Sequence, residues 1–148
     1  DGYYADAAWT IGIGQIKSEA ERLMEITKKA LFAGIEAAKP GKTLGDIGFA
    51  IQTIVEGAGF HVIKGLTGHG VGKELHEDPS VFNFGKKGTG MPLKPGMVLA
   101  IEPMVAMGAG NIVQRPDESY ATADGSLSAH FEHTIAITEY GTEILTEE

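Results

Sequence analysis

The stretch "SAHFEHTIAIT", residues 128–138, gives the clearest fold signal in the chain and also contains its least expected polar residues. Its second half is rich in β-branched residues, a composition typical of a buried β-strand. Its first half contains His130, Glu132 and His133, where a strand would normally bury apolar side chains. Because burying an unpaired carboxylate costs several kcal/mol, a buried Glu132 predicts a partner for its charge.

Two amphipathic helices are expected upstream of this strand. Ser18 and Glu21 have the spacing of a capping box, and apolar residues then recur at helical intervals until "KPGK". Thr43 and Asp46 repeat the start signal, and a second apolar face follows them. The expected helices span residues 18–39 and 43–58.

Short strands are expected in the rest of the chain. After residue 59, apolar runs separated by glycine and proline predict a mostly antiparallel sheet. Residues 2–14 mix aromatic and β-branched residues with glycine, which indicates one strand or a pair of strands. Residues 65–96 form a polar, glycine-rich segment that we expect to be a long loop, and loops of that length inside a compact domain are usually functional.

Length, charge and cysteine content limit the function. A chain of 148 residues can form one domain with a hydrophobic core. The absence of cysteine excludes a thiol nucleophile or zinc–thiolate site and, without a secretory or membrane-length segment, favours a cytoplasmic setting. The formal net charge of −8 argues against nucleic-acid and anionic-membrane partners, because clustered lysine and arginine residues bind these.

Residues of metal-ligand type recur at three other places, and each has an ordinary structural explanation. Asp6 lies among alanine and aromatic residues, where it could be an edge or turn residue. His69 and His76 could be incidental loop histidines, although glycines on both sides of His69 would let backbone pack closely around its imidazole. Glu102 precedes a proline at the end of an apolar run, where it could be a solvated strand end.

Taken together, these residues suggest a metal site. The set comprises one aspartate, one histidine and two glutamates, each in or next to an apolar run: Asp6, His69, Glu102 and Glu132. An oxygen-rich set with a single imidazole suits divalent manganese, iron, cobalt or zinc. A cation would also offset the cost of burying the carboxylates. The spacings are too long for a local metal motif, so their convergence in the fold is a hypothesis.

Four separated blocks of the sequence resemble the signature blocks of type I methionine aminopeptidases, which are metallopeptidases with the pita-bread fold. These blocks are "DGYYAD", "GHGVG" with "LHEDP", "LKPGMVLAIEPM" and "SLSAHFEHTIAITEYGTEILT". The resemblance runs in register almost from end to end of the chain. Two of its parts, "IEPM" and "FEHT", are more similar to type I enzymes than to type II enzymes, prolidase or aminopeptidase P.

The resemblance implies an α+β pita-bread fold in which two helices back a mostly antiparallel sheet. Residues 1–148 would form a single catalytic domain of the M24 peptidase type. This domain would contain the last strand or strands of the first half of the fold and the whole second half. On this view the chain is incomplete at its N-terminus, and the missing half would carry another metal aspartate, a catalytic histidine and most of the methionine pocket.

The resemblance also implies roles for individual residues in metal-assisted removal of N-terminal methionine from nascent polypeptides. The metal ligands would be Asp6, His69, Glu102 and Glu132. Asp6 and Glu132 would bridge two divalent ions (Co, Mn, Fe or Zn), of which one could still bind to this chain. His76 would bind the substrate carbonyl, and Glu102 would pass a proton to the leaving amine. His130 and His133 would have supporting roles.

Two departures from the family pattern affect these expectations. Residues 117–120 are "DESY" where many members have "DGWT", so Glu118 or Ser119 replaces a tryptophan beside the pocket. Without the upstream half, the chain is expected to have little or no activity and to self-associate or pair with that half through exposed apolar surface. Two other functions remain open, a prolidase or aminopeptidase P-like peptidase and a non-catalytic pita-bread module that binds a partner.

Overall fold

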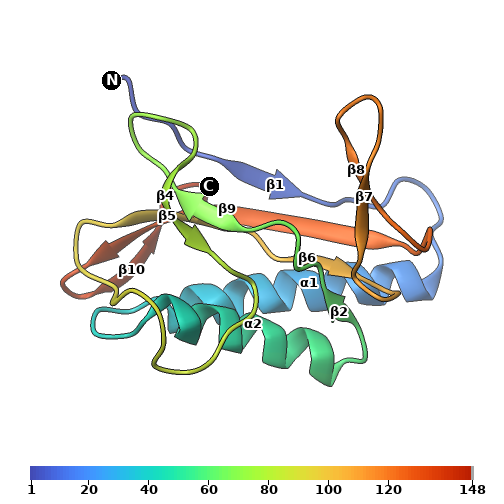
Figure 1. The fold of residues 1–148 in the computed structure, drawn as a ribbon, viewed down its shortest axis with the longest axis horizontal. Helices are drawn as coiled ribbons and strands as arrows, with labels where there is room; N and C mark the ends of the chain where they lie inside the picture. The colour runs from blue at the N-terminus through green and yellow to red at the C-terminus, as the bar shows by residue number, and fades with distance from the viewer. Residues whose placement is uncertain (148) are drawn as a thin grey trace.

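The computed structural model describes residues 1–147, in which two neighbouring helices pack against one face of a sheet (Figure 1). Helix α1 spans Ser18–Ala37 and α2 spans Leu44–Gly57. The strands are β1 (Ala7–Trp9), β2 (His61–Val62), β3 (Gly68–Gly70), β4 (Glu77–Val81), β5 (Val98–Ile101), β6 (Met104–Ala106), β7 (Ile112–Gln114), β8 (Tyr120–Thr122), β9 (Ser128–Thr138) and β10 (Gly141–Ile144). The expected α+β class, with two helices and a mostly antiparallel sheet, is confirmed.

The two helix starts differ from each other. At α2, the side chains of Thr43 and Asp46 form the expected capping box, and the Thr43 backbone N–H donates to Asp46 Oδ2 at 2.9 Å. At α1, the expected capping box is wrong, because Lys17 is the N-cap and Ser18 is already inside the helix. The acidic Glu21 instead lies in the first turn, where the helix dipole favours negative charge.

Strand β9 lies at the centre of the main sheet. It pairs with β5 and β6 along one edge and with β1 and β10 along the other, and every pairing is antiparallel. Beyond β5 the sheet continues through β3 to β4, and beyond β6 it continues to β2. Strands β7 and β8 form a separate hairpin that projects from the sheet (Figure 1). Eleven consecutive residues of β9 therefore connect almost every part of the sheet.

Two expectations about strands need correction. The segment 65–96 is not one loop, because β3 and β4 lie inside it and form part of the sheet. The glycines of β3 hide this strand from sequence patterns, since glycine is rare in strand interiors. The opening segment forms a single three-residue strand, and Asp6 lies immediately before it rather than within it.

The hydrophobic core lies between the helices and the sheet. Leu31 of α1 and Ile51 of α2 are fully buried there, against Leu99, Ile101 and Ile135 of the sheet. Replacing such a side chain with a smaller one leaves a cavity, because the surrounding core relaxes only in part. We expect Ile51→Ala to lower the free energy of unfolding by about 2–5 kcal/mol, measured by urea denaturation. The partly buried Ile54 of the same helix is the control, and Ile54→Ala should cost clearly less.

Several large apolar side chains near the N-terminus are exposed, including Tyr3, Trp9, Ile11 and Ile13. This surface is compatible with the expected self-association, which stays a prediction. Neither helix in the described part of the chain is long and apolar enough to cross a membrane.

Candidate metal centre

Strand β9 divides its side chains between two environments. Phe131, His133 and Ile135 point toward the helices, where Phe32 of α1 packs against the His133 ring. Because successive strand residues face opposite sides, His130, Glu132 and Thr134 point to the face that the helices leave open. The polar residues of the stretch 128–138 therefore lie on both faces of the sheet. His133 is in the layer that faces the helices, and Glu132 is on the open face.

The sheet register brings Glu102 and His69 to the same open face. In β5, Ile101 pairs with His133, so Glu102, one residue further, lies next to Glu132. In β3, His69 pairs with Ala100 of β5 and therefore shares the face of that residue's side chain. Ligand atoms of His69, Glu102 and Glu132 lie within 4.8 Å of one another, although the residues come from three strands.

The glycines that flank His69 are required by close backbone contacts. A Cβ on Gly68 would collide with the carbonyl oxygen of Ala100, and a Cβ on Gly70 would collide with that of Asp78. Glycine at these positions lets β5 and β4 approach β3 from both sides. The backbone of β3, which carries His69, is consequently held closely between β5 and β4.

Asp6 reaches the open face from the other edge of β9. Its backbone N–H donates to Thr134 Oγ1 at 2.8 Å, and the Thr134 hydroxyl donates back to the Asp6 carbonyl at 2.8 Å. Ligand atoms of Asp6, His69 and His76 form a second group within 4.8 Å of one another. His76 is exposed just before β4, and its ring centroid lies 4.3 Å from that of His69.

The four residues expected to bind metal thus fall into two overlapping groups. His69 belongs to both, Glu102 and Glu132 to one, and Asp6 to the other together with His76. Among the described residues, no such group contains Asp6 and both glutamates.

Glu132 has the environment that makes a partner for its charge necessary. The residue is only 3% exposed, and within residues 1–147 its Oε1 atom receives no hydrogen bond. Burial, and then the neighbouring carboxylates of Glu102 and Asp6, raise its pKa to about 7, against a smaller opposite effect of His130. A buried oxygen without a partner beside other carboxylates and an imidazole fits a divalent cation, whose charge would favour ionised carboxylates.

His69 presents a defined nitrogen atom to this cluster. Its Nδ1 lies 2.8 Å from the carbonyl oxygen of Gly70, which can only accept a hydrogen bond. In the neutral imidazole Nδ1 therefore carries the proton, and Nε2 keeps its lone pair. Nε2 lies 3.4 Å from Glu102 Oε1, so the lone pair faces the carboxylate cluster. Such a bond to the second nitrogen is the usual way in which proteins orient a metal-binding histidine.

Two further residues lie close to Glu102, of which His130 was expected to have only a supporting role and Asn83 had no expected role. His130 Nε2 lies 3.3 Å from Glu102 Oε2, so two imidazoles flank one carboxylate. Asn83, which is 1% exposed, donates from Nδ2 to the Glu102 carbonyl at 3.0 Å and fixes the backbone that carries this side chain. An asparagine inside the apolar run "VFNF" was the available signal for this role.

Comparison with known proteins decides the family. The model of metallopeptidase family M24 matches residues 1–139. The chain belongs to this family. Membership of a metallopeptidase family implies the use of a divalent metal ion.

Relatives of this M24 chain at about half identity are methionine aminopeptidases. The chain is 49% identical over 147 residues to methionine aminopeptidase 1 of Bacillus subtilis and 50% identical to the methionine aminopeptidase of Clostridium acetobutylicum. Each alignment covers 99% of this chain and 59% of the relative, so the chain spans about three fifths of the length of these proteins.

Solved structures confirm the pita-bread fold of the M24 chain. Methionine aminopeptidase from Thermotoga maritima superposes with a TM-score of 0.97 at 50% identity, covering 99% of this chain and 59% of that one. Prolidase from Pyrococcus furiosus gives a TM-score of 0.75 at 29% identity, covering all of this chain and 38% of that one.

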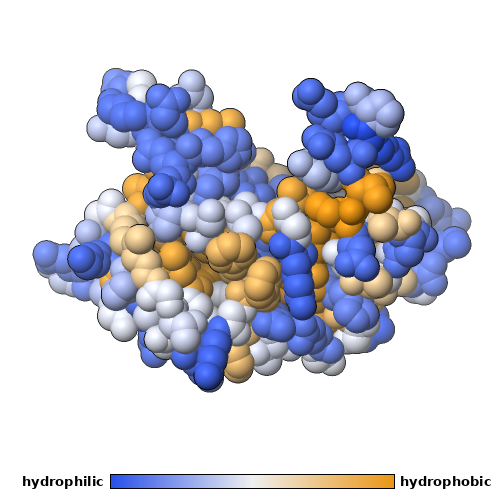
Figure 2. Space-filling model, viewed as in Figure 1, coloured by the Kyte–Doolittle hydropathy of each residue, from blue (hydrophilic) through white to orange (hydrophobic). Residues whose placement is uncertain are grey.

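A small cavity of about 240 Å³ adjoins the cluster of candidate metal ligands in the M24 chain. Its lining includes His130 together with the apolar side chains of Ile63, Leu66, Met104 and Ile112. Figure 2 shows hydrophobic residues at the base of the projecting β7–β8 hairpin, beside a hollow in the surface. An apolar side chain bound here would lie next to the carboxylates.

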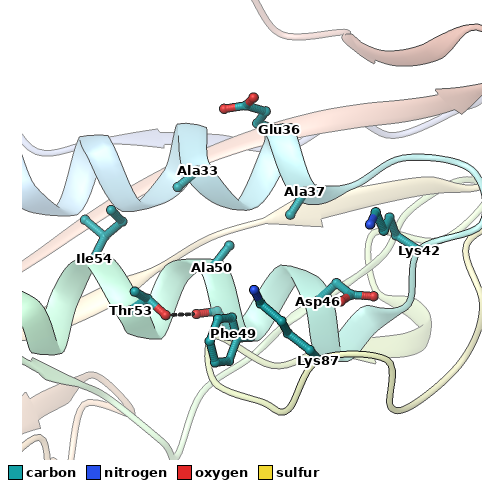
Figure 3. A pocket seen from close by; sticks show the side chains of 10 residues that line it. All are labelled: Ala33, Glu36, Ala37, Lys42, Asp46, Phe49, Ala50, Thr53, Ile54 and Lys87. Carbon is teal, nitrogen blue, oxygen red and sulfur yellow. Dashed lines mark hydrogen bonds between the residues drawn. The ribbon is translucent and has the colours of Figure 1, made fainter.

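A larger groove, of about 440 Å³, lies between the two helices and is separate from this centre. Figure 3 shows Ala33 and Ala37 of α1 pointing toward Ala50 of α2, with Lys42 near one end and Lys87 beside Phe49. None of the residues that line this groove belongs to either group of candidate metal ligands. We therefore place the candidate chemistry on the open face of the sheet and not between the helices.

Proposed function

We propose that this chain contributes the metal-binding part of a methionyl aminopeptidase, which hydrolyses the peptide bond after an N-terminal methionine. The main support is the meeting of His69, Glu102 and Glu132 on one face of the sheet, with a buried Glu132 oxygen that receives no hydrogen bond from residues 1–147. The names of the relatives at 49% and 50% identity support methionine as the residue removed. If the substrate is a nascent polypeptide, the protein acts in the cytoplasm, where such chains are made.

In this proposal His69, Glu102 and Glu132 hold a divalent cation, and Asp6 contributes from the neighbouring strand. When bound, the ion would polarise the substrate carbonyl and lower the pKa of a water molecule. Mixed imidazole and carboxylate donors are compatible with manganese, iron, cobalt or zinc. A second ion bridged by Asp6 and Glu132 is part of the same proposal.

Glu102 is assigned the proton transfer. Its side chain is 12% exposed and lies between His69 and His130, so it is shielded from bulk water but open to the face where substrate would bind. A carboxylate in this position can take a proton from the attacking water and return it to the leaving amine. Asn83 would keep Glu102 in place through its backbone carbonyl.

His76 is assigned to the substrate carbonyl. It is exposed beside His69, and its imidazole N–H can donate a hydrogen bond to the oxygen that becomes negative during hydrolysis. The cavity beside His130 is assigned to the methionine side chain, because its walls include the apolar side chains of Ile63, Leu66, Met104 and Ile112.

Two other functions remain as alternatives. A prolidase-like activity has the weaker structural support, since the TM-score falls from 0.97 for a methionine aminopeptidase to 0.75 for a prolidase. A binding module without catalysis would have no need for a buried carboxylate beside other ligand-type side chains, and this chain has one at Glu132. Pairing with an upstream half, or self-association, would cover the exposed apolar residues near the N-terminus.

Methionine release tests the proposal. Because the chain spans three fifths of its relatives, it is assayed alone and fused behind the unmatched N-terminal segment of the Bacillus subtilis relative. With added Mn²⁺, the fusion is expected to release methionine from a Met-Ala peptide and to leave Xaa-Pro peptides uncut. The isolated chain is expected to show little or no activity.

The role of His76 is tested in the same fusion. We expect His76→Gln to lower kcat by about 100-fold with little change in KM, since the hydrogen bond forms mainly in the transition state. His61→Gln, at an exposed imidazole outside the centre, serves as the matched control. Preferential cleavage of Xaa-Pro peptides, or full activity of His76→Gln, would show that the assignment is wrong.

A further inference from the structure

A cavity of about 620 Å³ lies at the end of the sheet where β5 begins, and we call it the downstream cavity. Its lining includes Tyr3, Tyr4, Glu77, Asp78, Val98 and Leu145. Val98 lies two residues before Ala100 in β5, so its side chain is on the open face that Ala100 and His69 share. Of the described residues that line this cavity, none belongs to either group of candidate metal ligands.

The candidate metal centre lies between the downstream cavity and the cavity assigned to the methionine side chain. In β9, His130 lines the methionine cavity and Glu132 belongs to the centre. Ala136, which pairs with Val98, follows Glu132 by about 13 Å along the strand. A peptide with its first side chain in the methionine cavity and its first peptide bond at the centre therefore extends toward the downstream cavity.

The downstream cavity combines an apolar wall with acidic side chains. Tyr4 and Leu145 are half exposed in this wall, and the carboxylates of Glu77 and Asp78 also line the cavity. The Tyr4 backbone N–H donates to the Gly72 carbonyl at 2.8 Å, which joins the N-terminal segment to the loop before β4 (Figure 1). Lysine and arginine suit such a site, because their methylene groups lie along apolar surface while their charge stays at its edge.

The ring of Tyr3 already has a cation against its face. Lys73 Nζ lies 3.7 Å from the ring centroid, which is the geometry of a cation–π contact. Both side chains are exposed, so the ammonium or guanidinium group of a bound peptide can replace that of Lys73 on the ring. This wall of the downstream cavity is therefore able to bind a positive charge.

We propose that the downstream cavity binds the second to fourth residues after the scissile bond and prefers lysine and arginine there over aspartate and glutamate. Tyr4 precedes Asp6 by two residues, so the cavity begins about 7 Å from the centre, which an extended peptide spans with two residues. Its far end, near Ala136, is reached with about four residues. The direction of the peptide rests on the proposed function, which places the methionine on the other side of the centre.

Hydrolysis of paired peptides by the fusion protein tests this preference. Met-Ala-Lys-Lys-Lys-Gly and Met-Ala-Glu-Glu-Glu-Gly differ only at the second to fourth residues after the scissile bond. We expect kcat/KM to be about 10-fold higher for the lysine peptide at low ionic strength, because attraction of one peptide and repulsion of the other add. The ratio should fall in about 0.5 M NaCl, since salt screens exposed charges.

Asp78→Asn and Tyr3→Leu are the test variants for the downstream cavity. Each should lower the ratio of the two kcat/KM values by about 3-fold, the size of one exposed ion pair or cation–π contact. Glu143→Gln, at an exposed position of β10 outside the cavity, is the control and should keep the wild-type ratio. Equal kcat/KM for the two peptides in the wild type, or the wild-type ratio in both test variants, would overturn the proposal.

Nuclear magnetic resonance tests the downstream cavity without any activity measurement. The nitrogen-15-labelled 148-residue chain, with folding checked by circular dichroism, is titrated with Ala-Lys-Lys-Lys-Gly. The amide signals of Tyr4, Gly72 and Val98 are expected to shift, and to shift less with Ala-Glu-Glu-Glu-Gly. Shifts confined to other residues would overturn the cavity as the binding site. Shifts at these three residues, with no methionine released by the fusion from any peptide, would support the cavity and count against the proposed function.

Discussion

Glu132→Gln is expected to stabilise the chain in the presence of a chelator and to abolish its stabilisation by divalent cations. In the metal-free protein above pH 7, Glu132 is a buried carboxylate near two other carboxylates, and its Oε1 accepts no hydrogen bond from the described residues 1–147. Glutamine has almost the same shape and no charge, so it removes this penalty. We expect a gain of about 2 kcal/mol at pH 8, or a rise in melting temperature of about 4–8 °C.

The pH dependence of this gain has a definite sign. The folded-state pKa of Glu132 is raised from 4.5 to about 7, so ionisation of this residue opposes folding. The penalty is absent below pH 4.5, grows as the pH rises and is complete above pH 7. The advantage of glutamine in chelator should therefore disappear toward pH 4.5.

Added metal should reverse the order of the two proteins. Mn²⁺ at about 100 times its dissociation constant stabilises a chain that binds it by about 2.7 kcal/mol, and Glu132→Gln should gain little of this. Glu143→Gln, at an exposed position in β10, is the matched control and should behave as wild type in both conditions. Equal stabilisation of wild type and Glu132→Gln by Mn²⁺, or a lower melting temperature of Glu132→Gln in chelator, would contradict the assignment of Glu132.

Gly68→Ala is expected to lower both stability and metal affinity. The added Cβ would collide with the Ala100 carbonyl oxygen and would lie 3.3 Å from the Cβ of Val81. A backbone carbonyl in a paired strand cannot move away without breaking the pairing of β3 with β5, so β3 must shift and carry His69 with it. We expect a loss of about 1–3 kcal/mol in urea denaturation, as for other overpacked sites, together with weaker Mn²⁺ binding.

The same chemical change at Gly57 provides the control. Gly57 is the last residue of α2, and a Cβ placed there would have no heavy atom within 4 Å. Because alanine is a better helix former than glycine, Gly57→Ala should be neutral or stabilising by up to about 1 kcal/mol. A Gly68→Ala protein as stable as Gly57→Ala would show that the close approach of β3 and β5 is not needed.

The sequence predicted the parts of the fold that depend on local patterns. The capping box of α2 and the strand 128–138 each depend on residues within one short segment, and both predictions are confirmed. Glu132 was identified because burying a carboxylate costs free energy, whatever the position of its strand in the sheet. The start of α1 was predicted wrongly, because Ser18 and Glu21 have the spacing of a capping box but the chain enters the helix one residue earlier.

Local patterns could not predict how distant strands align. The meeting of Glu102 with Glu132 depends on the register of β5 against β9, and no residue within either segment specifies it. The closeness of His76 to His69 depends on the pairing of β3 with β4, two strands that were expected to be loop. The resemblance to type I methionine aminopeptidases supplied what these patterns lacked, and comparison confirms the family.

The central claim is that His69, Glu102 and Glu132 together bind a divalent cation. Its most direct test is the anomalous scattering of Mn²⁺ in a crystal of the chain grown at a low concentration of the ion. We predict a single strong peak in contact with Nε2 of His69 and with carboxylate oxygens of Glu102 and Glu132. A strong peak elsewhere with none at these three residues, or no peak at a concentration that saturates binding in solution, would contradict the claim.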